Sequence, residues 1–194
     1  MMTGPIVETP EEHFLTKYKN FYKMGISLNW NLNSYETTIL KNGYVSILGT
    51  DKYYKPIILI DLEIFPKILE PALLTIILKI LALVRMKMHI PKKVEASKII
   101  LNIEGKNLIS NGKLVKDLLI CLDIFQHQYD ELLILKPSWS IQQLISFIKK
   151  LGMNNDYENK IKLLRTKEEI CENFGKLLNS KFIPKKFGGS RQKG

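Results

Sequence analysis

The sequence predicts an α/β fold built around a largely parallel β-sheet. Short runs of Ile, Val and Leu alternate with longer stretches whose apolar residues recur at helical spacing, and Gly, Pro, Asn and Asp residues separate them. Alternation of this kind brings parallel strands together, with helices packed across them. A chain of 194 residues has the length of one domain and can bury a core without disulfides.

The first half of the chain predicts two helices on either side of two strands. The predicted elements are a helix at Glu11–Met24, a loop at 29–34, strands at Tyr44–Leu48 and Ile57–Asp61, and a helix over Phe65–Met88. Pro66 and Pro71 lie near the start of that last helix, where proline is tolerated. They allow either two short helices or one kinked entry.

Within this second helix, the stretch from Ala72 to Val84 is apolar apart from Thr75 and Lys79. Its thirteen residues are too few to span a membrane, which takes about twenty. We therefore expect a buried helix that is apolar almost all round. Two explanations are open: other elements cover it on several sides, or part of it faces an apolar guest molecule.

The second half of the chain predicts three further strands and three further helices. The predicted strands are Lys98–Ile103, Glu131–Leu135 and Lys160–Leu164. The first of the helices is capped by Ser110 or Asn111 and carries an apolar stripe of Leu114, Leu118, Cys121 and Leu122. The other two helices are predicted at Trp139–Leu151 and Lys167–Leu178. Ser138 is the expected cap of the helix at Trp139. Thr166 and Glu169 have the spacing of a capping box.

The composition and motifs exclude several classes of function. The net charge of +10 favours an anionic partner, but the basic clusters around 85–93 and 181–193 have few interleaved aromatics, which disfavours nucleic acid. The sequence has no nucleophile elbow and no nucleotide-binding glycine loop, and its three His residues are far apart. We therefore expect no enzyme, no metal site and no cofactor. Cys121 and Cys171 fit core residues of a reducing compartment, and the N-terminus does not read as a leader peptide.

Six short segments, in a fixed order, resemble one known family. They are Asp51–Ile57, Val94–Gly105, Gln128–Leu132, Leu133–Pro137, Lys160–Ile161 and Ile183–Gly189, the last ending in Phe-Gly-Gly. Together they resemble the CRAL-TRIO lipid-binding domains, and most closely the yeast-type phosphatidylinositol/phosphatidylcholine transfer proteins. The family pattern is altered at Asn102, Asp130 and Leu132, and only 43 residues precede the first strand.

The resemblance implies a mixed, largely parallel five-stranded sheet whose helices enclose an apolar cavity for one lipid. It divides the chain into a short appendage at 1–43, the lipid-binding domain at 44–189 and a basic flexible tail at 190–194. The cavity would be lined by Leu74, Ile77, Leu78 and Leu81. The family's mobile gate helix would lie at about 138–151, with an apolar side formed by Trp139, Ile141, Leu144, Ile145, Phe147, Ile148 and Leu151. The alternative for this stripe is an ordinary amphipathic helix packed on the sheet.

Matching the motifs residue by residue assigns the lipid headgroup to four side chains: Lys186, Ser97, Tyr129 and Glu131. Lys186 matches a lysine that contacts inositol phosphate in the transfer proteins, and a buried phosphate needs such a cation. The alternative for Lys186 is an exposed lysine of the tail. Ser97, Tyr129 and Glu131 match positions at or near the choline-lipid site.

The resulting hypothesis is a monomeric, soluble, cytoplasmic lipid-transfer protein. It would hold one lipid, most simply a phospholipid, and exchange it at anionic membrane surfaces, where Lys149 and Lys150 of the gate would meet the headgroups. The alternative is a divergent protein-interaction scaffold of the same family that docks a small GTPase or another protein without transferring lipid.

Overall fold

The fold is organised around one mixed β-sheet. The computed structural model describes residues 32–53, 55–87, 96–124, 128–150 and 159–190, and at 85–87, 124 and 148–150 the backbone alone. The strands are β1 (Val45–Thr50), β2 (Pro56–Asp61), β3 (Ser97–Asn102), β4 (Tyr129–Leu135) and β5 (Ile161–Leu164). They lie in the order β1-β2-β3-β4-β5, with β1 antiparallel to β2 and all other neighbours parallel.

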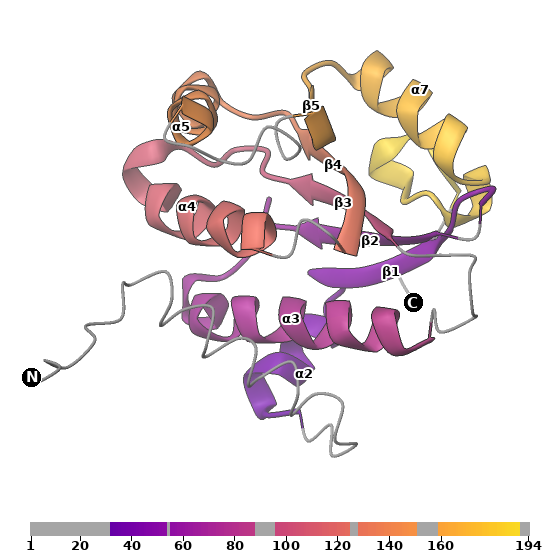
Figure 1. Ribbon diagram of the computed structural model, residues 1–194, viewed down its shortest axis with the longest axis horizontal. Helices are drawn as coiled ribbons and strands as arrows, with labels where there is room; N and C mark the ends of the chain where they lie inside the picture. The colour runs from indigo at the N-terminus through magenta and orange to yellow at the C-terminus, as the bar shows by residue number, and fades with distance from the viewer. Residues whose placement is uncertain (1–31, 54, 88–95, 125–127, 151–158, 191–194) are drawn as a thin grey trace, which may run out of the picture.

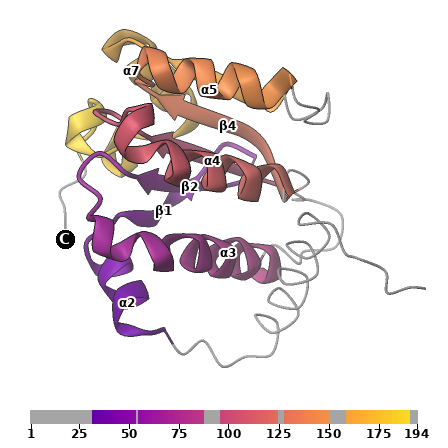
Figure 2. The same ribbon diagram turned by 90° about the vertical axis from the view of Figure 1, so that its left-hand side faces the viewer.

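Helices cover both faces of the sheet (Figures 1 and 2). They are α2 (Ser34–Lys41), the 3₁₀ turn η1 (Lys67–Leu69), α3 (Glu70–Lys87), α4 (Leu108–Ile124), α5 (Trp139–Lys150), α7 (Lys167–Leu177), and the turns η3 (Ser180–Phe182) and η4 (Lys185–Phe187). Residues of α2, α3, α4 and α5 pack together on one face, and those of α7 and the C-terminal turns pack on the other. The predicted α/β architecture with a largely parallel five-stranded sheet is confirmed.

The central strands are apolar because both of their faces are covered. In β3, Ile99 and Leu101 belong to the apolar cluster beneath α3, α4 and α5, whereas Ile100 belongs to the cluster beneath α7. β2 and β4 alternate in the same way. Strands that are buried on both faces lose the alternation of polar and apolar residues, which explains the continuous Ile and Leu runs of the sequence.

The apolar helix α3 is covered by protein on several sides. Leu73, Ile76 and Ile77 are at most 1% exposed, and α3 packs against α2, α4 and the sheet. Lys79 is paired with the buried carboxylate of Glu36 in α2, with 2.6 Å between Nζ and Oε2. Protein elements thus account for much of the burial of α3. Among the described residues, no helix has the length and apolarity needed to cross a bilayer.

Two helix starts differ from the prediction. The sequence predicted no element at α2, yet Asn33 caps it and forms a reciprocal capping box with Glu36. The predicted caps of α4, Ser110 and Asn111, are wrong. The helix starts earlier, and the side chain of Asn107 accepts the Ser110 amide at 2.9 Å. The Thr166–Glu169 capping box of α7 is confirmed.

Pro66 precedes the single turn η1, and Pro71 lies in the first turn of α3. Of the two alternatives left open by the sequence, the structure shows one long helix entered through a single 3₁₀ turn, and not two short helices. The predicted helix at Glu11–Met24 lies outside the described residues.

The segment after α7 folds back onto the sheet. Ile183 and Phe187 are buried with residues of α7, and the Phe187 ring stacks on Phe174 with centroids 5.0 Å apart. Two glycines make this turn possible. Gly188 has a φ of +88°, and a Cβ on Gly189 would lie 2.0 Å from the carbonyl oxygen of Ile183. The conformation fixes the position of Lys186 at the end of β2.

Candidate functional site

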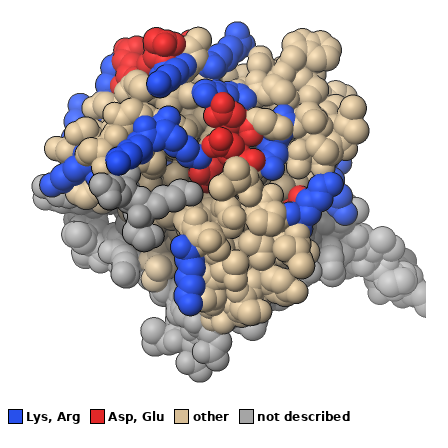
Figure 3. Space-filling model, turned by 180° about the vertical axis from the view of Figure 1, so that it is seen from behind, with Lys and Arg blue, Asp and Glu red and all other residues tan. Residues whose placement is uncertain are grey.

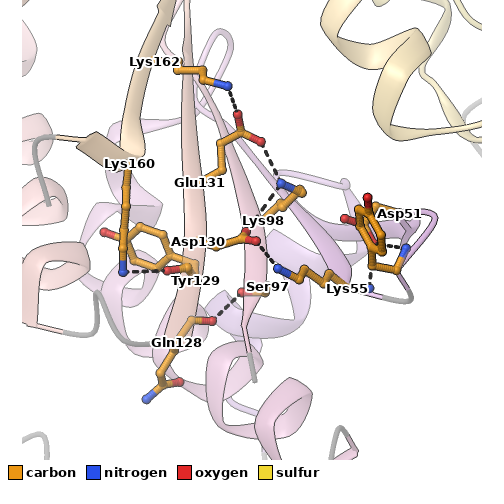
Figure 4. Close-up of polar contacts among 11 residues, drawn as sticks. Asp51, Lys55, Ser97, Lys98, Gln128, Tyr129, Asp130, Glu131, Lys160 and Lys162 are labelled. Atoms are coloured by element: carbon orange, nitrogen blue, oxygen red, sulfur yellow. Dashed lines mark hydrogen bonds and ion pairs between the residues drawn. The ribbon is translucent and has the colours of Figure 1, made fainter. Parts of the chain in front are cut away.

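Ser97 and Tyr129, two of the predicted headgroup residues, lie side by side at the start of β3 and β4 (Figure 4). Ser97 Oγ donates to the carbonyl of Gln128 at 3.0 Å, and the Tyr129 hydroxyl donates to the carbonyl of Leu122 in α4 at 2.9 Å. Both residues are buried. In this conformation their hydroxyls hold the strand starts together and join β4 to α4.

An extra residue in β4 turns Glu131 away from this pair. Ser97 is opposite Tyr129, but Lys98 is opposite Glu131, so Asp130 is a bulge in the ladder. As a result, Tyr129 packs in the cluster beneath the helices α3 and α4. Glu131 alternates with Leu133, which lies in the cluster on the α7 side. The bulge therefore places Tyr129 and Glu131 on opposite faces of the sheet.

Glu131 belongs to a chain of ion pairs, which we call the amino-edge network: Lys55, Lys98, Asp130, Glu131 and Lys162 (Figure 4). Glu131 lies between Lys98, at 2.8 Å, and Lys162. Asp130 lies between Lys98, at 3.5 Å, and Lys55. The Asp51 side chain accepts the amides of Tyr53 and Lys55, which shapes the β1–β2 turn that carries Lys55.

Within this network, the lysines favour the ionised form of Glu131. Burial alone would raise the pKa of Glu131, but hydrogen bonds from Lys162 and Lys98 outweigh burial and lower it. Burial would likewise lower the pKa of Lys98, but its hydrogen bond to Glu131 and the charge of Asp130 raise it. The carboxylate of Glu131 is thus already neutralised by two partners from neighbouring strands.

Lys186 lies in a second group, the carboxyl-edge cluster: Asp61, Glu63, Asn102 and Lys186. Lys186 Nζ is 2.5 Å from Asp61 Oδ2 and 2.7 Å from Glu63 Oε2. Asn102 donates to Asp61 Oδ1 at 2.8 Å and to Glu63 Oε2 at 3.2 Å. Lys186 is therefore more than an exposed tail lysine, because it joins the C-terminal segment to the ends of β2 and β3.

The pKa values of Glu63 and Lys186 move in the directions expected for an ion pair. The hydrogen bond from Lys186 lowers the pKa of Glu63. Burial would lower the pKa of Lys186, but its hydrogen bonds to Asp61 and Glu63 raise it. A phosphate that binds Lys186 must therefore compete with the two carboxyl groups that already hold its ammonium group.

The structure does not bring the four predicted headgroup residues together. Ser97 and Asn102 are the first and last residues of β3, which separates them by about 16 Å at the usual rise of a strand. Ser97 and Tyr129 lie near one end of the sheet, Lys186 lies at the other end, and Glu131 faces the α7 side. One headgroup cannot contact all four in this conformation.

The predicted cavity and gate residues lie in and around the apolar cluster between the sheet and α3, α4 and α5. Ile77, Leu78 and Leu81 are buried in it, and Leu74 packs at its border. From α5, Ile141 and Ile145 are buried in the same cluster, Leu144 packs against it, and Trp139 and Phe147 are exposed. The side chains of Ile148, Lys149, Lys150 and Leu151 lie outside the described part, as do those of the basic cluster at 85–93.

Several residues of these sites were missed from the sequence: Asp61, Glu63, Asn102, Lys98 and Lys162. One signal was available, since Asp61 and Asn102 each end an apolar run, and parallel strands end at the same edge. Lys186 also lies at that edge, but it is 125 residues further along the chain than Asp61. In the described residues, no group of three or more His, Cys, Asp or Glu side chains is arranged to hold a metal ion.

Comparisons with known proteins agree with this architecture. The model of the CRAL/TRIO domain family matches residues 40–189. The crystal structure of Sfh5 has the same fold, with a TM-score of 0.55 at 8% sequence identity, covering 83% of this chain and 66% of the Sfh5 chain. No curated protein matches the sequence. Since the family model spans most of its length, the chain belongs to the CRAL/TRIO domain family of lipid-binding proteins.

Proposed function

We propose that this chain holds one lipid between the sheet and the helices α3, α4 and α5, and exchanges it at membrane surfaces. We propose a phospholipid as the ligand and a place near the yeast-type phosphatidylinositol/phosphatidylcholine transfer proteins within the family. The observation that carries the proposal is the continuous aliphatic cluster beneath these helices, to which Ile77, Leu78 and Leu81 contribute.

The composition of this cluster suits acyl chains. A lipid that leaves a bilayer loses about 0.8 kcal/mol for each CH₂ group that is not buried again. The protein must therefore offer the lipid tails an apolar environment of comparable extent. The cluster consists almost entirely of Ile, Leu and Val, and Phe65 and Tyr129 are its aromatic members.

The arrangement of α5 favours it as the element that opens. Among its described side chains, Ile141 and Ile145 are buried and Leu144 is partly buried against the cluster. Trp139 and Phe147 are exposed. A helix held mainly by one apolar stripe can leave the sheet without breaking a polar network, and it already presents large apolar groups outward.

Substituting Phe147 by Asp should abolish exchange while leaving the chain folded. The side chain is exposed, so a carboxylate costs little in water, but it opposes contact with the bilayer as α5 opens. The measurement is transfer of labelled phosphatidylcholine between vesicles, with circular dichroism as the test of folding. Tyr53→Asp, in the β1–β2 turn, is the matched control and should transfer as the unmodified chain does. Equal transfer by Phe147→Asp and the control would contradict a gate at α5.

The scaffold alternative has one observation in its favour: Lys186, the cation expected at a headgroup, is already paired within the protein. A chain that transfers no phospholipid, in any variant, would support it.

A further inference from the structure

Five large apolar side chains are exposed along one edge of the sheet, where β2, β3 and β4 end. They are Ile64 and Ile68 after β2, Leu108 and Ile109 after β3, and Trp139 after β4, with exposed fractions of 62%, 71%, 42%, 99% and 75%. Because these strands are parallel, the residues that follow them emerge at the same edge.

The three junctions are close to one another in space. Figure 2 shows that α3, α4 and α5 all begin on the same side of the molecule. The Leu108 amide donates to Ser140 Oγ at 3.2 Å, so the first turns of α4 and α5 are in contact. The exposed side chains therefore belong to one surface, which we call the junction edge.

The shape of the junction edge favours a bilayer over a folded protein as its partner. Ile109 is almost fully exposed, Ile68 and Trp139 are 71% and 75% exposed, and the five side chains come from three separate junctions. A protein would need a matching pocket for each of them. The interface of a bilayer accepts projecting side chains without such pockets, and it is the preferred location of tryptophan.

The charges of the junction edge agree with this partner. Its acidic residues Asp61 and Glu63 are paired with Lys186, and Glu104 is paired with Lys136 at 2.8 Å. Glu70, at the start of α3, is a further acidic residue at these junctions, and the structure shows no ion pair for it among the described residues. Figure 3 faces this side of the molecule and shows acidic side chains gathered near its centre among lysines, with uncharged surface around them.

Three lysines flank the apolar side chains directly. Lys67 precedes Ile68, Lys106 lies two residues before Leu108, and Lys113 lies one helical turn after Ile109. Long lysine side chains can keep their ammonium group at the level of lipid phosphates while a neighbouring apolar side chain enters the interface.

We propose that the junction edge is the surface by which this chain docks on a phospholipid bilayer. Ile68, Ile109 and Trp139 enter the interface, and Lys67, Lys106 and Lys113 lie among the headgroups. The inference rests on the proposed function in taking a membrane as the partner. It assigns the contact to the junctions after β2, β3 and β4, whereas the gate prediction concerns the far part of α5.

The test uses the full chain with Trp30→Phe, so that Trp139 is the only tryptophan. Vesicles of phosphatidylcholine mixed with phosphatidylserine should shift its emission to shorter wavelength, and brominated phosphatidylcholine should quench it. The double variant Ile68→Gln, Ile109→Gln should weaken vesicle binding by about tenfold or more, since two inserted aliphatic side chains are lost. Tyr53→Gln, at the opposite end of β2, is the control and should bind as the parent does.

Unchanged Trp139 emission, or equal vesicle binding by the double variant and the control, would overturn the inference and leave the junction edge to a protein partner. Mass spectrometry of an organic extract separates this result from the proposed function. A double variant that carries lipid but no longer binds vesicles supports docking by this edge. A parent chain that binds vesicles through this edge but carries no lipid supports docking and contradicts lipid transfer.

Discussion

Lys186 has a structural role that its place in the Phe-Gly-Gly motif does not reveal. Its ammonium group is held by Asp61 and Glu63, and Asn102 donates to both carboxylates. The side chain of Asp61 is only 9% exposed, so its oxygens need hydrogen-bonding partners within the protein, and Lys186 and Asn102 supply them. The same lysine is the residue that the family resemblance assigns to a lipid phosphate, and substitution can separate the two roles.

Lys186→Ala should lower the free energy of unfolding by about 1 kcal/mol at pH 7, a modest value because the cluster is partly exposed to solvent. Lys186 holds the pKa of Glu63 below its ordinary value of 4.5. A lowered carboxylate pKa stabilises the fold above the unfolded-state pKa, and this contribution is lost as pH falls through the folded-state value. The difference from the parent should therefore shrink below about pH 4.5. Urea unfolding at pH 7 and pH 3 measures it, with Lys185→Ala as the control.

The same variant tests the headgroup assignment. If Lys186 contacts the lipid phosphate, transfer of phosphatidylinositol between vesicles falls in Lys186→Ala, while Lys185→Ala transfers normally. Unchanged transfer together with the stability loss would limit Lys186 to joining the C-terminal segment to β2.

Among the elements, the strands were the easiest to predict. The Ile and Leu runs of β2, β3 and β4 end at Asp61, at Asn102 and just before Pro137, and burial of these strands on both faces leaves no alternation of polar and apolar residues. α2 was missed because its eight residues have few apolar side chains, although Asn33 and Glu36 have the spacing of a capping box. The bulge at Asp130 has no local signal, since it depends on the pairing of β3 with β4. The family resemblance placed Tyr129 and Glu131 in one site, and the bulge turns them to opposite faces of the sheet.

The ion pair between α2 and α3 should matter for the stability of the helical layer. Lys79→Met should cost about 3 kcal/mol, because it leaves the carboxyl group of Glu36, which is 1% exposed, buried without its cation. Adding Glu36→Gln should recover much of this loss, since the amide can still accept from the Asn33 amide. Thermal and urea unfolding of both variants measure the coupling. The control is Lys176→Met, which breaks an exposed ion pair with Glu172 in α7 and should change the free energy of unfolding little. With Glu36→Gln measured alone as well, a loss in the double variant equal to the sum of the two single losses would mean that the two charges do not interact.

For the whole molecule, the two ends of the parallel sheet are different in chemistry. The amino-edge network satisfies its charges internally on the α7 side, between strands. The carboxyl end combines the carboxyl-edge cluster, which includes Lys186, with the exposed apolar side chains of the junction edge. The net charge of +10 suggested an anionic partner without locating it. Several lysines of the described part are in fact used in internal ion pairs, and Lys67, Lys106 and Lys113 border the proposed bilayer contact.

The central claim is that the apolar layer beneath α3, α4 and α5 accommodates a lipid. Its most direct test is mass spectrometry of an organic extract of the full chain purified from cells. The account predicts one phospholipid per chain, and loss of that lipid when Ile77, in the centre of the layer, is replaced by Asn in protein that stays folded. An extract without stoichiometric lipid, from protein that also fails to transfer labelled lipid between vesicles, would contradict it.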